Sequence, residues 1–347
     1  MGKLQVMLAV FLVFCATAAA ETQVKGEMYP QWHMDFSEAA DHYSSFEVTR
    51  SYVTVTSDLS EQTSMRATMD IRSITGFSGY TMVLKYGYMD WKPTFSKRLS
   101  FRLGLQQTMY IDYMTKMWGR RYLEKTVGDL YGYLTPADLG ASTQINFGNS
   151  GATTLHVAVF NGTAYTNVKD LNKQKDVNAV LACKPAQNNS KFKNSMIVGQ
   201  FYYGTQNVAF TPANDPDDYR NHLYSIGGIL DYTDRFSVGL DANWQNLGAG
   251  ATAPDVDASA ISLYGTYLLA RHTKEGSFLN HCNIFGRIDF VDPNSSASND
   301  LQTYLIIGFE CVSSAKIKTS LNVRTIAYQA PAVSNKSFLY FNALVSF

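Results

Sequence analysis

The sequence predicts an all-β fold: a transmembrane antiparallel β-barrel of about 16 strands connected as an up-and-down meander. Three observations predict it. Apolar and polar residues alternate along many short segments, and short and long connections between these segments alternate as well. Charged residues make up only 17% of the 347 residues, which include 22 Tyr and 20 Phe. This composition suits a large β-protein whose strands each have one apolar and one polar face.

The charge and cysteine counts exclude several classes of protein. The chain has 29 Lys and Arg against 29 Asp and Glu, so its formal net charge is zero and we expect no nucleic acid partner. It has 9 Pro and 4 Cys, which argues against a disordered chain or a disulfide scaffold. Cys183, Cys282 and Cys311 show no CxxC spacing. We therefore expect small apolar residues on strands rather than a zinc site or a complete set of disulfides.

The first segment has the pattern of a signal peptide. Lys3 precedes an apolar run at 7–14, and three alanines end at Ala20. We expect cleavage before Glu21, because a small-residue site follows the apolar run. The run is too short for a transmembrane helix, which needs roughly 20 apolar residues. Residues 1–20 are thus predicted to be a signal peptide and residues 21–347 to form the barrel.

Strict alternation identifies the strands. In residues 235–245, Phe236, Val238 and Leu240 fall on one face and Asp241 on the other. Helical spacing would mix the charged residues into the apolar set. The same pattern recurs at 64–72, 98–106 and 316–325. We expect strands near 28–36, 46–57, 62–72, 80–90, 97–108, 138–147, 153–162, 177–187, 194–205, 220–231, 235–246, 258–271, 277–290, 300–310, 315–328 and 337–347.

The connections between these strands favour a membrane barrel. Short turns, such as 58–61 and 232–234, alternate with longer segments, such as 109–137 and 206–219. Barrels of the bacterial outer membrane have short periplasmic turns and longer external loops. The last strand also ends on an aromatic residue, Phe347, which is typical of such barrels. We therefore expect export to the outer membrane of a Gram-negative bacterium.

A soluble secreted β-protein is the alternative fold, because stacked sandwiches also alternate, with the apolar face inward. Two features favour the barrel. The connection rhythm suits a meander better than Greek-key crossings. Aromatic residues also recur near strand ends, where membrane barrels carry aromatic girdles. These aromatic residues are Tyr80, Tyr88, Trp91, Phe201, Tyr202 and Tyr203.

If the apolar face meets lipid, the polar face lines a lumen wide enough for water. Ten basic residues then point inward, against the acids Asp70, Asp241, Asp289 and Glu310. Such an excess favours anions in the pore, unless each base is neutralised by a neighbouring acid. We predict a pore lined by Arg66, Lys85, Arg98, Arg102, Arg287, Lys318 and Arg324. The other three inward bases are Arg72, Arg235 and Lys316.

The longest connection, 109–137, contains six aromatic residues, which argues against disorder. The sequence allows two locations for this connection. It folds into the barrel and narrows the pore, or it stays outside as a solvated loop or a subunit contact. In the first case Lys116, Arg120, Arg121 and Lys125 lie near the constriction.

Short motifs resemble the phosphate-selective porin O/P-like family. They are FEVTRSYVTVTSDLSEQTSMRATMDI at 46–71, the pair Gln106-Gln107, WGRRY at 118–122 and ADLGAS at 137–142. The resemblance covers roughly residues 46–147. It implies a trimeric anion channel with Arg and Lys along the pore, carried over here to Arg102, Arg120 and Arg121. The long loop has no dense Lys cluster of the kind that a tight phosphate site would need.

These observations predict a porin that forms a water-filled diffusion channel. The expected partners are small hydrophilic or anionic solutes, outer-membrane lipid and two further copies in a homotrimer. No motif of a hydrolase, nucleotide-binding or metalloprotease site occurs, so we expect no enzymatic activity, cofactor or metal. The alternative is an outer-membrane or secreted β-protein whose loops serve adhesion or binding.

Overall fold

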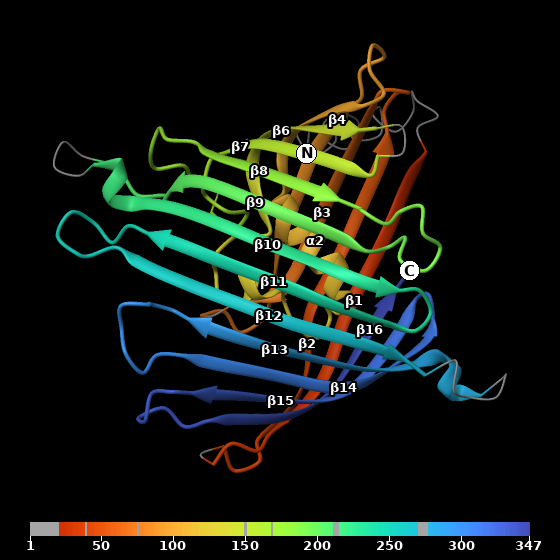
Figure 1. The fold of residues 1–347 in the computed structure, drawn as a ribbon, viewed down its shortest axis with the longest axis vertical. Helices are drawn as coiled ribbons and strands as arrows, with labels where there is room; N and C mark the ends of the chain where they lie inside the picture. Colours follow the sequence, from red (N-terminus) through yellow and green to blue (C-terminus); the bar gives the residue numbers. More distant parts are fainter. Residues whose placement is uncertain are drawn as a thin grey trace, which may run out of the picture.

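The computed structural model describes residues 21–38, 40–74, 76–148, 151–167, 169–210, 215–269 and 277–347. The predicted signal peptide, residues 1–20, lies outside the described residues. Sixteen antiparallel strands form one closed barrel, in which each strand pairs with its neighbours in sequence and β1 pairs with β16 (Figure 1). The predicted all-β barrel, its meander topology and its strand number are confirmed.

The strands are β1 (Thr22–Asp35), β2 (Ser44–Asp58), β3 (Thr63–Ser73), β4 (Tyr80–Trp91), β5 (Leu99–Gln107), β6 (Ala137–Phe147), β7 (Thr153–Phe160), β8 (Asp176–Cys183), β9 (Met196–Thr205), β10 (Arg220–Tyr232), β11 (Phe236–Leu247), β12 (Val256–Leu268), β13 (Cys282–Asp292), β14 (Gln302–Ser314), β15 (Ile317–Tyr328) and β16 (Lys336–Ser346). Two 3-10 helices, η1 (Pro216–Tyr219) and η3 (Phe278–His281), precede β10 and β13.

The two ends of the chain meet where the barrel closes. The Gly26 amide donates to the Phe347 carbonyl at 3.1 Å, and the Phe347 amide donates to the Gly26 carbonyl at 3.0 Å. Strand β1 begins six residues before the predicted start at residue 28. Its pairing with β2 shifts between Tyr29 and Pro30, so a single alternation does not run through the whole strand.

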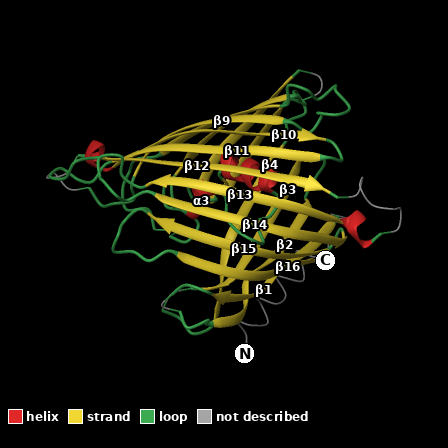
Figure 2. Ribbon diagram, turned by 60° about the horizontal axis from the view of Figure 1, so that its bottom comes forward, coloured by secondary structure: helices red, strands yellow, loops and turns green. Residues whose placement is uncertain are grey.

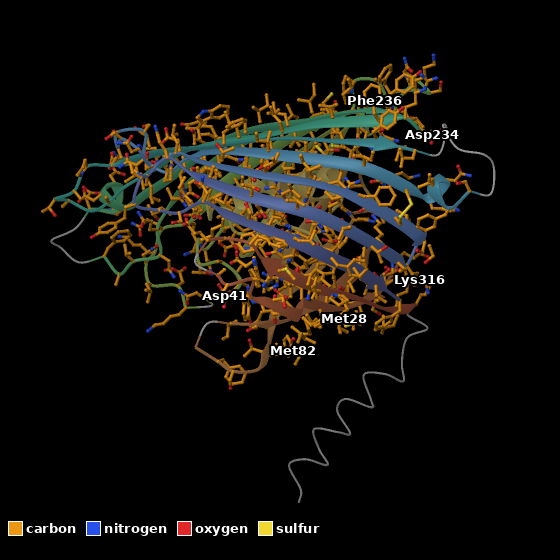
Figure 3. The ribbon with its side chains drawn as sticks, turned by 90° about the horizontal axis from the view of Figure 1, so that it is seen from below. Met28, Asp41, Met82, Asp234, Phe236 and Lys316 are labelled. Atoms are coloured by element: carbon orange, nitrogen blue, oxygen red, sulfur yellow. A yellow bond between two sulfur atoms is a disulfide. The ribbon has the colours of Figure 1, made fainter. Side chains whose placement is uncertain are left out.

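The apolar faces of the strands point outward. On β11, Leu240 and Trp244 are exposed, whereas Asp241 and Asn243 between them are buried. Figure 3 shows Met28, Met82 and Phe236 on the outer side of the ribbon, and all three are exposed. A soluble sandwich would bury this face, so the fold is that of a membrane barrel.

Within the described ranges, no helix has the length and apolar character needed to cross a membrane.

Short connections gather at the end of the barrel that carries the chain termini, called here the terminal end. Asp234 and Lys316 lie in two of these turns and appear at the same end in Figure 3. Two connections at this end, 184–195 and 269–281, are longer than the predicted turns. The opposite end, called the loop end, has the longest connection, 108–136. The predicted alternation of short and long connections is therefore clearest where the turns are shortest.

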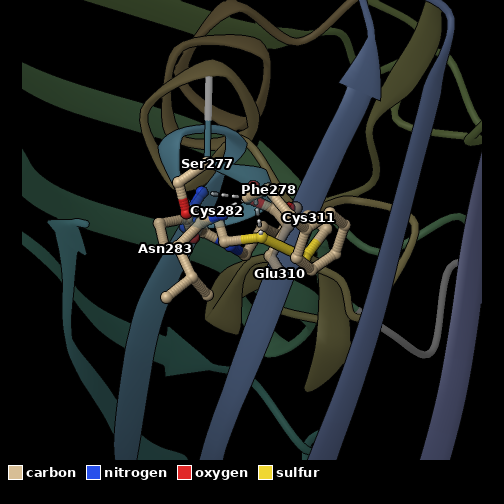
Figure 4. The surroundings of a disulfide bond; sticks show 8 residues. Ser277, Phe278, Cys282, Asn283, Glu310 and Cys311 are labelled. Carbon is tan, nitrogen blue, oxygen red and sulfur yellow. Dashed lines mark hydrogen bonds and ion pairs between the residues drawn. A yellow bond between two sulfur atoms is a disulfide. The ribbon is translucent and has the colours of Figure 1, made fainter. Parts of the chain in front are cut away.

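The prediction that the three cysteines act only as apolar residues is wrong for two of them. Cys282 and Cys311 form a disulfide, while Cys183 is free. Cys282 and Cys311 lie directly opposite each other on β13 and β14, with Cα atoms 4.2 Å apart (Figure 4). The Cys282 carbonyl faces β12, where it accepts from the Leu269 amide, so the two cysteines form a non-hydrogen-bonded pair with closely spaced side chains.

Candidate functional site

The long connection folds into two helices, α2 (Met109–Trp118) and α3 (Val127–Leu130). Tyr110, Met114 and Trp118 follow each other at four-residue spacing, so α2 has one apolar stripe, and all three are buried. Lys116 lies on the other face and is exposed. Gly119 ends the helix in the left-handed conformation, with φ at 67°, and turns the chain away from the helix axis.

Helix α2 lies inside the barrel, against the inner face of β9, β10 and β11 (Figures 1 and 2). Tyr110 and Met114 pack on Val180 and Val198, which are lumen-facing residues of β8 and β9. The Tyr110 hydroxyl donates to Asp241 Oδ1 on β11 at 2.9 Å. The loop therefore occupies the lumen rather than the solvent outside the barrel.

Four side chains, which we call the Arg120 anchor, hold the loop beyond Gly119: Arg120, Tyr122, Asn283 and Glu310. Arg120 Nη2 donates to Asn283 Oδ1 at 2.8 Å and to Glu310 Oε2 at 3.0 Å. The Tyr122 hydroxyl donates to Glu310 Oε1 at 2.7 Å. Burial and the neighbouring Glu310 raise the pKa of this hydroxyl, so it stays protonated as a donor.

The second half of the loop contacts β13, β14 and β15. Arg324 Nη1 lies 3.5 Å from Glu124 Oε2, which also accepts from the Tyr304 hydroxyl at 3.0 Å. Arg287 donates to the backbone carbonyl of Lys125. It also forms a bidentate ion pair with Asp289, with Nη2 2.6 Å from Oδ2 and Nε 2.8 Å from Oδ1. Polar contacts thus fix the loop where its apolar stripe ends.

A cavity of about 480 Å³ remains on the other side of the lumen. The loop forms one wall of this cavity, and the inner faces of β1–β4 form the opposite wall. Basic lining residues outnumber acidic ones, five to three. The bases are Lys25, Arg66, Lys85, Lys116 and Arg121, and the acids are Glu27, Asp112 and Asp129.

Adjacent residues of the WGRRY motif point to different places. Arg120 lies in the anchor and is buried, so it does not face the cavity. Arg121 lines the cavity, with Nη2 3.6 Å from Asp129 Oδ2. Lys125 Nζ lies 3.3 Å from Asp129 Oδ1. Of the four loop bases predicted near the constriction, Lys116 and Arg121 line the cavity.

The inward bases carry less net charge than the sequence suggested. The four inward acids counted on the strands did not include Asp90, and the loop adds Glu124 and Asp129. Arg102, for example, pairs with Asp90 at 2.6 and 2.9 Å. Among the described ion pairs, seven of the eleven predicted site residues have a carboxylate partner: Arg102, Lys116, Arg120, Arg121, Lys125, Arg287 and Arg324.

The four other predicted site residues lie in different surroundings. Arg66 and Lys85 line the cavity and form no ion pair with any described residue. Lys318 occupies a lumen-facing position on β15, outside the cavity lining. Arg98 lies one residue before β5 and is exposed at the terminal end, although the prediction placed it on the strand.

Some residues of the site were missed from the sequence. Arg50 on β2 faces the lumen and pairs with Asp70, but β2 alternates imperfectly because its pairing with β1 shifts near Pro30. Tyr52 and Tyr86 also line the cavity, although aromatic residues were expected mainly on the outer girdles. Their position between charged residues on neighbouring strands is the signal that could have found them.

The fold is similar to solved structures of outer-membrane proteins. The chain aligns with OprB of Pseudomonas putida at 11% identity and a TM-score of 0.66, over 94% of each chain. With OmpT of Vibrio cholerae the identity is 12% and the TM-score 0.65, over 95% of this chain and 99% of that one. With the outer membrane channel DcaP of Acinetobacter baumannii they are 12% and 0.63, over 96% and 99%.

The fold is thus a closed barrel like those of these outer-membrane proteins. OmpT of Vibrio cholerae is also known in a trimer form. No protein-family model and no curated protein matches the sequence. The resemblance to the phosphate-selective porin O/P-like family therefore stays a prediction.

Proposed function

We propose that this protein is an outer-membrane porin, a water-filled diffusion channel for small hydrophilic solutes with a preference for anions. One observation carries the proposal: a barrel that is apolar outside encloses a cavity lined by five bases and three acids. Three of the bases, Lys25, Arg66 and Lys85, have no carboxylate partner among the described residues. A basic lining of this kind lowers the barrier for anions.

The geometry favours a general anion preference over phosphate selectivity. Lys116 and Arg121 are both held by carboxylates, with Lys116 Nζ 2.7 Å from Asp112 Oδ2. The unpaired positive charge on the cavity wall is therefore small. We also propose a homotrimer, a state in which OmpT of Vibrio cholerae has been solved. Cross-linking of the folded protein in outer-membrane vesicles should yield three linked copies, and a purely monomeric pattern would contradict this.

Recording from planar bilayers tests the channel. Folded protein should give discrete conductance steps, and a KCl gradient should give a reversal potential of the sign for chloride. The absence of steps would favour the alternative, a barrel whose loops serve adhesion or binding. Replacement of Arg66 by Gln should move the reversal potential toward that of potassium, whereas Lys92→Gln, in the exposed turn before β5, should leave it unchanged.

A further inference from the structure

Arg66 and Lys85 line the cavity from neighbouring strands and form no ion pair with a described residue. The Lys85 side chain is nearly fully buried, at 7% exposure, and its described polar partner is the Tyr52 hydroxyl at 3.2 Å. Arg66 uses Nε to reach Thr68 Oγ1 at 3.0 Å and has four Nη hydrogens left. A buried cation without an anion is costly, so an anionic ligand would stabilise this arrangement.

Both cations flank the same aromatic ring. The Arg66 guanidinium lies 4.7 Å from the centroid of Tyr86, and the Lys85 ammonium lies 5.4 Å from it. Lys85 also lies 4.6 Å from the centroid of Tyr52. Both charges therefore lie beside the same ring on the cavity wall. The cations occupy the faces of these rings, which leaves little aromatic surface for a solute to stack on.

The acids of the cavity already have partners. Asp112 is held by Lys116, and Asp129 by Arg121 and Lys125. Glu27 accepts a hydrogen bond from the Tyr29 hydroxyl at 2.8 Å. The carboxylates therefore do not neutralise the two free cations directly.

Hydroxyl groups surround these cations. Thr54 and Thr68 on the barrel wall lie with their Oγ1 atoms 2.9 Å apart, and Thr56 lies on the same wall. Thr115 of α2 lines the cavity from the opposite side. Each hydroxyl both donates and accepts, so it can bind a hydroxyl group of a solute. The cavity volume, about 480 Å³, falls within the range of small-molecule sites.

We propose that this cavity is a saturable binding site for small hydroxylated organic anions, the class of sugar acids and sugar phosphates. The proposal rests on the channel function proposed above and names its solute class. Arg66 and Lys85 bind the anionic group, and Thr54, Thr56, Thr68 and Thr115 bind the hydroxyls. An anion without hydroxyls uses half of the site, and a neutral sugar uses the other half.

Block of the chloride current tests the site. Gluconate and glucose 6-phosphate should each block reconstituted channels at concentrations about tenfold lower than glucose or inorganic phosphate, because they engage both sets of groups. Arg66→Gln and Lys85→Gln should each weaken block by gluconate about tenfold, since each removes charge-assisted hydrogen bonds. The double variant Thr54→Val with Thr68→Val should weaken gluconate block and leave phosphate block unchanged. Lys92→Gln serves as the matched control.

The outcomes separate the two proposals. Channels that conduct chloride but are blocked best by inorganic phosphate, or equally by all four solutes, would overturn the solute class and leave the channel intact. Preferential block by only one of the two anions would restrict the class to acids or to phosphates. Protein without conductance would contradict the channel. In that case calorimetric titration of the folded protein with gluconate decides the binding site alone, and no heat above that of the Arg66→Gln variant would overturn it.

Discussion

Two walls of the same lumen differ in what they carry. The inner faces of β8 and β9 present Val180 and Val198, which are fully buried beneath α2. The inner faces of β3 and β4 present Arg66 and Lys85, which border the cavity. The outer faces of all four strands are apolar, so the difference exists only inside. We call the first the packed wall and the second the open wall.

The two walls explain how one chain forms both an open cavity and a loop that fills the rest of the lumen. An apolar inner face binds the apolar stripe of the loop, because burial of apolar surface is favourable there as in any protein core. A polar inner face offers the stripe no apolar surface to bury against, and its polar groups stay hydrated. The position of the loop therefore follows from the inner residues of the packed wall, with the Arg120 anchor as its polar complement.

The largest effect should come from breaking the Arg120 anchor, which holds the loop to β13 and β14. Glu310→Ala leaves Arg120 buried without its carboxylate, which should lower the free energy of unfolding by about 3–5 kcal/mol. We expect a lower urea midpoint and a higher single-channel conductance, because the loop leaves the lumen. The exposed pair of Lys175 and Asp170 gives the control: Lys175→Ala should cost less than about 1 kcal/mol. Equal losses would contradict the role of the anchor.

Removal of the disulfide should have the next largest effect. Cys282 and Cys311 precede and follow the anchor residues Asn283 and Glu310 on β13 and β14, so the bridge restrains the two strands that carry the anchor. Cys282→Ser with Cys311→Ser should lower the free energy of unfolding by roughly 3 kcal/mol, the entropy of a loop of this length. The folded fraction, read from the heat-modifiable band on gels at increasing urea concentration, measures this loss of stability. Free Cys183 gives the control, and a loss of equal size in Cys183→Ser would speak against the bridge.

Overpacking beneath the helix should have a moderate effect. A methyl group on Gly227 would overlap with Met114 Sδ of α2 and lie 2.9 Å from the Leu240 carbonyl oxygen. Gly227→Ala should therefore cost about 1–3 kcal/mol. At Gly199 on β9 no atom lies within 4 Å of such a methyl group, and Gly199→Ala should change stability much less. If both variants unfold at the same urea concentration, α2 does not pack on Gly227.

On the open wall, substitutions should change selectivity with little effect on stability. Arg66→Gln together with Lys85→Gln removes two of the three unpaired cavity cations, so anion preference should fall while the free energy of unfolding changes by less than about 1 kcal/mol. Reversal potentials and unfolding curves of the same preparation check both parts. A large stability loss with unchanged selectivity would assign these residues to the packed structure instead.

Much of the barrel was predictable because alternation depends only on nearest neighbours along a strand. The packed wall also left a signal. The segment of β8 carries Val177, Val180, Leu181 and Ala182 on both faces, which indicates that its inner face is covered as well. The loop position could have been inferred from this, since the loop was the one long segment available to cover it.

Other features depended on register and local geometry. The disulfide was missed because the predicted strand stopped at residue 310, whereas β14 continues to Ser314 and pairs Cys311 with Cys282. The separate roles of Arg120 and Arg121 depend on the left-handed turn at Gly119, which spacing alone does not reveal. The neutralising role of Glu124 depends on a contact with Arg324, 200 positions away in the chain.

Thiol labelling from the aqueous phase tests the division of the lumen most directly. In a Cys183→Ser background, cysteines are placed at Thr54 on β2, beside the open wall, and at Val198 on the packed wall. A charged, water-soluble methanethiosulfonate should modify Thr54→Cys rapidly and reduce its conductance, and it should leave Val198→Cys unmodified until the protein is unfolded. Equal labelling of both positions, or faster labelling at Val198→Cys, would contradict a loop that packs on one wall and leaves the other open.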